Sequence, residues 1–199
     1  MTDNNRKTIR YYDEHAEEFS TAANTADMSR DYERFLKYVP AGGTIVDIGC
    51  GNGRDLRFFS ESGYRASGVD ASETLCRLAA ENSGCPVVHC DALSWVPETE
   101  CDAIWANASL LHMPLEDIVS FIRTKTRHLK PGGVLYFSMK AGIGEGFDEK
   151  GRFFTPFSES IVDSVLAEGR LKVMERWTED DSLGRGGFHW EALILGRAD

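Results

Sequence analysis

Short apolar runs alternate with segments of helical periodicity from Thr44 onward. This alternation is typical of a mostly parallel sheet with helices on both faces, so the sequence predicts a doubly wound α/β fold. The predicted strands are residues 44–48, 64–70, 87–90, 102–106 and 134–139, which are too short for helices and rich in aliphatic or aromatic residues. The predicted helices are residues 54–61, Ser72 to about Asn82, Pro114 to about Leu129, and a last one around 161–166.

The two ends of the chain flank this core. Residues 171–177 and 190–195 predict two strands joined by a glycine-containing loop, and we expect an antiparallel edge pair. The N-terminal segment carries Tyr12 and Phe19 in a pattern typical of an amphipathic helix. We therefore expect one domain over residues 1–199, with a helical segment at 1–40 lying over an α/β core at 41–199. Residues 141–151 are glycine-rich and polar, which predicts a mobile loop.

A glycine-rich turn follows the first predicted strand directly, in the sequence Asp47-Ile48-Gly49-Cys50-Gly51-Asn52-Gly53. Glycine permits a sharp turn with positive φ, and its missing side chain lets a ligand approach the main chain closely. The helix that follows presents unpaired backbone amides, which suit a phosphate or the carboxylate of an amino-acid ligand. The turn therefore predicts a cofactor site, although a turn tightened only for packing has the same spacing.

A nicotinamide dinucleotide site is the obvious rival, because its G-x-G-x-x-G/A pattern also joins a strand to a helix. The third position of that pattern needs a small residue for close helix packing. Counted from Gly49 this position is Arg54, and counted from Gly51 it is Leu56. Neither register fits, so the sequence argues against NAD.

Two acidic residues end the next two predicted strands. Asp70 stands where a carboxylate accepts hydrogen bonds from both ribose hydroxyls of an adenosine moiety. Asp91 follows the third strand, where it either faces an adenine edge or caps a turn. The turn and Asp70 together indicate an adenosine-containing cofactor.

Five blocks of the chain resemble the class I S-adenosylmethionine-dependent methyltransferases, in the order and approximate spacing of that family. They are residues 46–53 (VDIGCGNG), 68–70 (GVD), 90–92 (CDA), 102–107 (DAIWAN) and 129–133 (LKPGG). The resemblance is close over about residues 40–140 and looser elsewhere. Residues 51–55, Lys140 and 144–146 are also similar to small single-domain bacterial members, including the tellurite-resistance type.

The resemblance implies a Rossmann-like seven-stranded sheet, mostly parallel with an antiparallel last strand, and S-adenosyl-L-methionine as the cofactor. It implies that Asp47 orients the turn, that Asp70 holds the ribose, and that Tyr12 closes over the cofactor. The implied cofactor-binding residues are Asp47, Gly49, Cys50, Gly51, Asp70, Ala71, Asp91, Ala92, Asn107, Ala108 and Tyr12.

His112 and Lys140 are the candidate catalytic residues, because both follow strands at the sheet edge where such folds bind ligands. A neutral imidazole suits proton removal from an acceptor, and an ordinary histidine pKa predicts turnover that rises with pH through roughly 6–7. Alternatively, His112 bonds a loop carbonyl. Lys140 either meets an acidic substrate or is a solvated lysine at a strand end. The other histidines show no metal-binding spacing, and we expect no metal.

The formal net charge of −10 and a pI near 5.0 oppose binding to DNA or RNA, so no nucleic-acid partner is expected. Five cysteines without a C-x-x-C pair indicate neither a disulfide framework nor a zinc site and fit a reducing compartment. The N-terminus is polar, and no apolar stretch approaches the ~18 residues of a membrane span. We expect a cytoplasmic protein without a membrane partner.

The predicted function is methyl transfer from S-adenosylmethionine to a small-molecule acceptor, because no substrate domain is inserted in the short chain. One alternative is a non-catalytic S-adenosylmethionine-binding module, since a fold does not guarantee a function. Another is a methyltransferase acting on a macromolecule. Enzymes that methylate amide or exocyclic amines carry an Asn-Pro-Pro-aromatic stretch, whereas Asn107 is followed by Ala108-Ser109-Leu110. The acceptor atom and the oligomeric state do not follow from the sequence.

Overall fold

The computed structural model of the chain describes residues 3–181, 183–184 and 186–198. The helices are α1 (Asp3–Glu14), α2 (Ala16–Ala23), α3 (Ser29–Leu36), α4 (Arg54–Glu61), α5 (Glu73–Ser83), α6 (Leu115–Lys125) and α7 (Glu159–Leu166), with short 3-10 helices η1 (Leu110–His112) and η2 (Thr126–His128). The strands are β1 (Thr44–Ile48), β2 (Arg65–Asp70), β3 (Val87–His89), β4 (Cys101–Ala106), β5 (Leu129–Ala141), β6 (Gly146–Phe147), β7 (Phe153–Phe154), β8 (Leu171–Asp180) and β9 (His189–Arg197).

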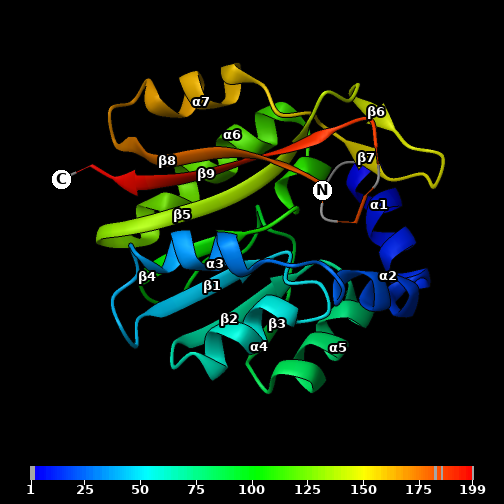
Figure 1. Ribbon diagram of the computed structural model, residues 1–199, viewed down its shortest axis with the longest axis horizontal. Helices are drawn as coiled ribbons and strands as arrows, with labels where there is room; N and C mark the ends of the chain where they lie inside the picture. Colours follow the sequence, from blue (N-terminus) through cyan, green and yellow to red (C-terminus); the bar gives the residue numbers. More distant parts are fainter. Residues whose placement is uncertain (1–2, 182, 185, 199) are drawn as a thin grey trace.

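A seven-stranded sheet with the order β3-β2-β1-β4-β5-β9-β8 forms the centre of the described fold (Figure 1). The strands from β3 through β5 pair in parallel, whereas β9 runs antiparallel to both of its neighbours, β5 and β8. The predicted doubly wound α/β fold with an antiparallel last strand is confirmed. The predicted pair at 171–177 and 190–195 is β8 and β9. Because β9 lies between β5 and β8, β8 alone of this pair is at the edge of the sheet.

Side chains of the central strands alternate between the two faces of the sheet, as the period of a β-strand requires. Trp105 of β4 packs in the core beneath α3 and α4, where its ring stacks on Tyr136 of β5 at 3.8 Å. Ile104, the preceding residue, packs in the other core with α6 and α7. Figure 1 shows the two pairs of helices on opposite faces of the sheet. Both faces of the sheet are therefore covered by helices, as the sequence pattern predicts.

Two helices begin and end where the sequence predicts. The helix at 54–61 is α4 without a change of bounds. At the start of α5, the Ser72 Oγ accepts a hydrogen bond from the Leu75 amide at 3.1 Å and satisfies one unpaired donor. Gly84 ends the same helix in the left-handed conformation, with φ of 67°. Local capping chemistry thus fixes the helix that follows Asp70.

Two segments differ from the sequence-based expectation. β5 begins at Leu129 rather than at residue 134, because its pairing with β4 resumes across a bulge: Cys101 pairs with Leu129, and Ala103 with Val134. The expected mobile loop at 141–151 instead contributes β6 to a short hairpin with β7. The Asp148 carboxylate closes this hairpin by accepting hydrogen bonds from the Lys150 and Arg152 amides.

The N-terminal helices divide into two groups. The first two, α1 and α2, lie at the end of the sheet where the parallel strands terminate, beside the β6–β7 hairpin (Figure 1). Asp13 anchors α1 to the start of α5, since its Oδ1 accepts hydrogen bonds from the Ser72 hydroxyl and the Thr74 amide. In contrast, α3 packs on the sheet face through Tyr32 and Phe35. The segment 1–40 therefore does not lie over the end of the sheet as a whole, because the apolar side of α3 packs into the core.

Candidate functional site

A cavity of about 340 Å³ lies at the carboxyl ends of the parallel strands. Its wall includes the glycine-rich turn after β1, the ends of β2, β4 and β5, and residues of α1 and α2. Doubly wound sheets bind their ligands at this edge. The volume also falls within the ~300–1,000 Å³ of small-molecule sites. The structure thus brings predicted site residues from distant parts of the chain onto one cavity.

The turn after β1 requires glycine at both positions that the sequence singled out. Gly49 and Gly51 have φ of 70° and 56°, in the left-handed region. A Cβ at Gly49 would lie 2.4 Å from the Cβ of Ser109, and one at Gly51 would lie 3.1 Å from the ring of Phe19. The turn therefore packs against Ser109 and Phe19 on two sides, and both glycines line the cavity.

The Asp70 carboxylate binds this turn from the end of β2. Its Oδ2 accepts a hydrogen bond from the Gly51 amide at 2.9 Å, and its Oδ1 accepts one from the Ser72 amide at 2.9 Å. Burial raises the pKa of Asp70 to about 6, although these amides act in the opposite direction. Asp70 thus presents an enclosed carboxylate to the cavity and holds the turn in shape.

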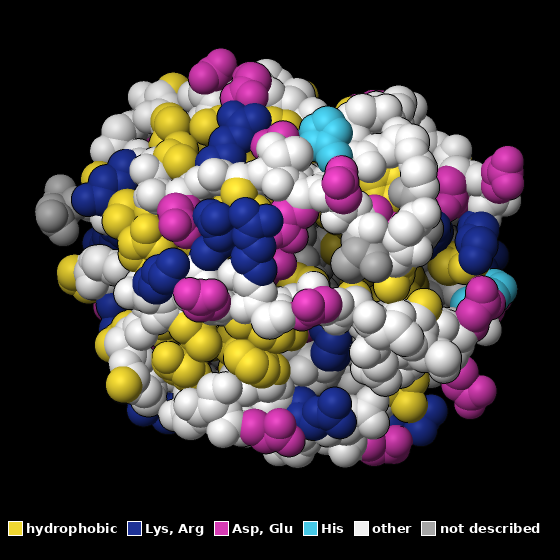
Figure 2. Space-filling view, in the orientation of Figure 1, with side chains coloured by type: hydrophobic (Ala, Val, Ile, Leu, Met, Phe, Trp, Pro, Cys, Tyr) yellow, Lys and Arg dark blue, Asp and Glu magenta, His cyan; other side chains and the backbone are white. Residues whose placement is uncertain are grey.

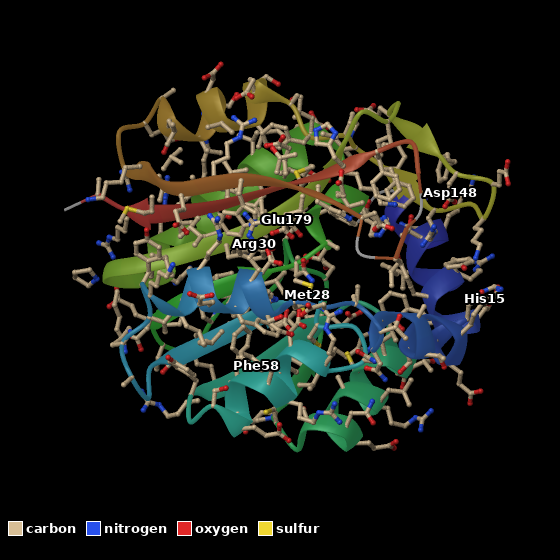
Figure 3. The ribbon with its side chains drawn as sticks, viewed as in Figure 1. His15, Met28, Arg30, Phe58, Asp148 and Glu179 are labelled. Atoms are coloured by element: carbon tan, nitrogen blue, oxygen red, sulfur yellow. The ribbon has the colours of Figure 1, made fainter. Side chains whose placement is uncertain are left out.

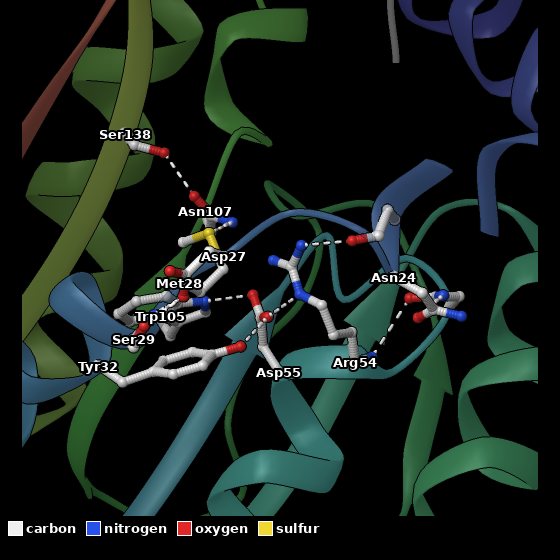
Figure 4. Close-up of polar contacts among 12 residues, drawn as sticks. Asn24, Asp27, Met28, Ser29, Tyr32, Arg54, Asp55, Trp105, Asn107 and Ser138 are labelled. Atoms are coloured by element: carbon white, nitrogen blue, oxygen red, sulfur yellow. Dashed lines mark hydrogen bonds and ion pairs between the residues drawn. The ribbon is translucent and has the colours of Figure 1, made fainter. Parts of the chain in front are cut away.

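Helix α2 is fastened over the same turn by two side chains (Figure 4). The Asn52 Nδ2 donates to Ser20 Oγ and to Asn24 Oδ1, each at 2.9 Å. The Arg54 Nη1 donates to the carbonyl of Ala23 at 2.9 Å. Arg54 departs from the dinucleotide pattern in the sequence. In the structure it connects α2 to the glycine-rich turn.

A buried polar cluster supports the start of α4 from below (Figure 4). The Asp55 Oδ1 accepts from the Tyr32 hydroxyl at 2.5 Å and from Arg54 Nε at 2.6 Å, while Oδ2 accepts from Trp105 Nε1 at 2.8 Å. Burial alone raises the pKa of Asp55, but the Arg54 guanidinium and these hydrogen bonds outweigh it and lower the pKa overall. The cluster joins α3, α4 and β4 and so fixes the helix that carries the turn.

The segment after β4 is shaped by Ser138 of β5. The Ser138 hydroxyl donates to Asn107 Oδ1 at 2.7 Å and accepts from the Ala108 amide at 2.9 Å. Ala108 has a positive φ of 50°, which is uncommon for a residue with a side chain and marks a strained bend. The bend directs Asn107 and Ser109 to the cavity wall. Within the described part of the chain, the buried Ser109 Oγ has no hydrogen-bond partner.

His112 is engaged through both ring nitrogens. Its Nδ1 lies 2.7 Å from the Phe153 carbonyl, which can only accept, so we assign the proton to Nδ1. Its Nε2 lies 2.9 Å from the Tyr12 hydroxyl and therefore accepts from it. Burial of the ring lowers the pKa of His112 to about 4. The sequence-based prediction of a rise in turnover near pH 6–7 therefore needs correction. With a pKa of about 4, the imidazole is neutral throughout that range.

Lys140 lies among aromatic rings rather than in bulk solvent. Its Nζ is 4.3 Å from the ring centroid of Phe188, 4.6 Å from that of Phe154 and 5.6 Å from that of Trp190. Both Lys140 and His112 line the cavity. The structure therefore brings the two candidate catalytic residues to one region of the site.

The fold matches a solved structure from Burkholderia thailandensis, 1,6-didemethyltoxoflavin-N1-methyltransferase with bound 1,6-didemethyltoxoflavin and S-adenosylhomocysteine. The TM-score is 0.75, at 19% identity, over 98% of this chain and 87% of that one. In sequence, trans-aconitate 2-methyltransferase of Azoarcus sp. (strain BH72) is 35% identical over 107 residues, or 51% of this chain and 41% of that protein. The tRNA (carboxymethyluridine(34)-5-O)-methyltransferase ALKBH8 of Macaca fascicularis is 35% identical over 124 residues, or 61% of this chain and 18% of that protein. This chain thus spans less than half the length of either relative.

The family model of the methyltransferase domain matches residues 45–133. This segment contains the glycine-rich turn, Asp70 and the bend after β4. Residues 45–133 are therefore similar to a methyltransferase domain. The finer resemblance to the tellurite-resistance group stays a prediction.

Ten of the eleven residues predicted to bind the cofactor line the cavity: Tyr12, Gly49, Cys50, Gly51, Asp70, Ala71, Asp91, Ala92, Asn107 and Ala108. Asp47 lies off the cavity wall, beneath the turn, and is almost fully buried. Burial raises the pKa of Asp47 well above its usual range, and the Asp55 carboxylate reinforces the shift. Its place favours an effect on the turn over direct contact with a cofactor.

Sequence reasoning missed Arg152, which also lines the cavity. Its Nε and Nη2 donate to Asp148 Oδ2 at 2.9 and 2.7 Å, and its Nη1 lies 3.4 Å from the Tyr12 hydroxyl. The available signal was an arginine placed directly before Phe153 and Phe154, four residues after an aspartate. Assigning the whole of 141–151 to a mobile loop concealed this signal.

Proposed function

We propose that the chain binds S-adenosylmethionine and transfers its methyl group to a small-molecule acceptor. The observation that carries the proposal is the joint position of the glycine-rich turn and Asp70, which meet through the Gly51 amide on the cavity wall. The three proteins compared above are all named as methyltransferases, which supports the same reaction type. The turn does not support the alternative of NAD binding, because Arg54 stands where a dinucleotide turn needs a small residue. Its side chain donates hydrogen bonds to Ala23 and Asp55.

The residues present fit the proposed cofactor. Each oxygen of the Asp70 carboxylate accepts one amide and retains a lone pair, so it accepts a second donor such as a ribose hydroxyl. The Ser109 Oγ is buried at the cavity wall without a partner among the described residues, and a bound polar group would satisfy it. Gly49 and Gly51 line the cavity and add no side chain of their own to its wall, which permits close approach of a ligand to the main chain.

When bound, the cofactor supplies a methyl group that its sulfonium has already activated. The contribution of the chain is then to bind, to orient and to exclude water, rather than to perform difficult chemistry. Tyr12 and Phe19 close the cavity from the N-terminal helices. The Asp13 anchor and the Asn52 contacts hold those helices in place.

A small molecule is the favoured acceptor, although one relative carries tRNA in its name. The net charge is −10, and on the face shown in Figure 2 the basic side chains are interspersed with acidic ones rather than gathered into a patch. No helix within the described residues is long and apolar enough to cross a membrane. Absence of nucleic-acid binding and a cytoplasmic location remain predictions.

The proposal is tested by incubating the full chain with S-adenosylmethionine and a library of small metabolites, and measuring S-adenosylhomocysteine release. We expect release above background with at least one acceptor and its loss in Gly49→Val. If S-adenosylhomocysteine binds tightly but no acceptor is methylated, the result favours a non-catalytic binding module over an enzyme. A response only to added RNA would move the acceptor to the macromolecular class.

A further inference from the structure

One end of the cavity is built from side chains that the cofactor-binding turn does not use. We call Tyr12, His112, Lys140, Arg152 and Phe154 the cationic end; all five line the cavity. The Phe154 ring stands at its centre, with Lys140 Nζ 4.6 Å and Arg152 Cζ 5.2 Å from the ring centroid. The His112 ring contacts the same ring at a centroid distance of 4.7 Å. Two positive charges therefore face one small region of the cavity.

The guanidinium of Arg152 is held in place from outside the cavity. Asp148, which is not on the cavity wall, accepts its Nε and Nη2 hydrogen bonds and lies beside α1 (Figure 3). The Nη1 is directed toward the Tyr12 hydroxyl. Because a paired arginine keeps further donors in the same plane, Arg152 is oriented for an acceptor oxygen rather than neutralised.

The cationic end lacks an available base among the described residues. Both nitrogens of His112 are engaged, one with the Phe153 carbonyl and one with the Tyr12 hydroxyl. Burial raises the pKa of Tyr12 above its ordinary value and lowers that of His112, so neither group becomes a strong proton acceptor at neutral pH. An acceptor that must lose a proton finds no group here to take it.

Several carboxylates that line the rest of the cavity have partners within the protein. The clearest cases are Asp31 with the Tyr136 hydroxyl at 2.9 Å, Asp181 with Trp190 Nε1 at 3.0 Å, and Glu179 with Arg30 at 3.3 Å, the pair shown in Figure 3. An ammonium group at the cationic end would also be repelled by Lys140 and Arg152.

We infer that the acceptor is a small carboxylate, bound by Arg152 and Lys140 at the cationic end and methylated on an oxygen that is already ionised. The inference rests on the proposed methyl transfer and names its substrate class. An acceptor carboxylate oxygen forms the new bond to the methyl carbon as the bond from that carbon to sulfur breaks. No proton moves, and a neutral ester and a neutral thioether result. The neutral, engaged His112 is then a support for Tyr12 rather than a base.

The test uses two sets of probes of similar size and different charge: benzoate, benzamide and benzylamine, and succinate, succinamide and 1,4-diaminobutane. Each is titrated calorimetrically into the full chain saturated with S-adenosylhomocysteine, and each is offered as an acceptor with S-adenosylmethionine. We expect one carboxylate to bind more tightly than its amide and amine partners and to yield a methyl ester by mass spectrometry.

Arg152→Gln and Lys140→Met should each weaken carboxylate binding by about 10-fold or more, as expected for a hydrogen bond to a charged group. The matched control is Lys150→Gln, because Lys150 is exposed, pairs with Glu18 at 3.6 Å and does not line the cavity. It removes the same charge two residues from Arg152 and should change binding by less than about twofold.

Preference for the amine, equal binding of all members of both sets, or no binding of any probe overturns the carboxylate assignment. Equal weakening by Lys150→Gln also overturns it, since the effect would then be general charge steering. If S-adenosylhomocysteine itself does not bind, the proposed function has failed instead. A titration with S-adenosylhomocysteine alone, made before the probes are added, distinguishes the two failures.

Discussion

Replacing Asp70 by asparagine should separate the two roles of this carboxylate, which are to hold the turn and to bind a cofactor. The parent carboxylate is enclosed and accepts hydrogen bonds from the Gly51 and Ser72 amides, and burial raises its pKa from 3.8 to about 6. Asparagine keeps the shape but cannot ionise. Its amide oxygen replaces only one of the two acceptors.

The raised pKa sets the sign of the effect on stability. An acid whose folded-state pKa lies above its unfolded value stabilises the fold fully below the unfolded pKa, and this contribution is lost as the pH rises through the folded pKa. A shift of about 2 pH units corresponds to about 3 kcal/mol in total, of which roughly half is lost between pH 5 and 7. The unfolding free energy of the cofactor-free parent, relative to Asp70→Asn, should therefore fall by about 1.5 kcal/mol over that range.

Urea unfolding of both proteins at pH 5, 6 and 7 measures this difference. Asp102→Asn is the control, because Lys130 and the Thr44 amide lower the pKa of Asp102 against the opposing effect of burial. Its difference from the parent should not change between pH 5 and 7. At pH 7, Asp70→Asn should also bind S-adenosylhomocysteine more weakly by about 1.5–3 kcal/mol, through the lost charged hydrogen bond. A pH-independent difference together with unchanged cofactor affinity would refute the reasoning on both counts.

The remaining predictions concern other parts of the site. His112 should contribute no inflection to kcat between pH 6 and 8, since its pKa is about 4; an inflection near pH 6.5 that disappears in His112→Gln contradicts this assignment. Asp55→Ala should cost about 3–5 kcal/mol in urea unfolding, because Arg54, Tyr32 and Trp105 lose a buried partner; a loss below about 1 kcal/mol argues against the cluster. Gly49→Ala should destabilise the fold more than Gly63→Ala, since both glycines have positive φ but only the Cβ at Gly49 meets Ser109; equal losses would show that φ alone matters. A mobility-shift titration at physiological salt should show no RNA or DNA binding, and saturation at sub-micromolar protein would reverse that expectation.

The sequence was sufficient for the parts of the fold that depend on neighbouring residues. β1 and α4 have the predicted bounds, because an apolar strand, a glycine turn and an amphipathic helix follow one another within 18 residues, from 44 to 61. The cofactor side of the cavity could also be anticipated. Asp70 and Asp91 follow from their places at the carboxyl ends of parallel strands, Asn107 follows from the family resemblance, and all three line the cavity.

The environment of His112 could not be predicted, because it depends on contacts between distant parts of the chain. Tyr12 lies 100 positions before His112, and Phe153 lies 41 positions after it. Both belong to segments whose placement depends on tertiary packing rather than on local periodicity. The same reason explains why Arg152 was overlooked, since the hairpin that presents it has strands of only two residues.

The identity of the cofactor is tested most directly by calorimetric titration of the full chain with S-adenosylhomocysteine and, separately, with NAD. We expect saturable, one-to-one binding of S-adenosylhomocysteine, weakened in Asp70→Asn, and no heat of binding from NAD because Arg54 occupies the position of the small residue that a dinucleotide turn requires. Saturable NAD binding without a response to S-adenosylhomocysteine or S-adenosylmethionine would contradict the account.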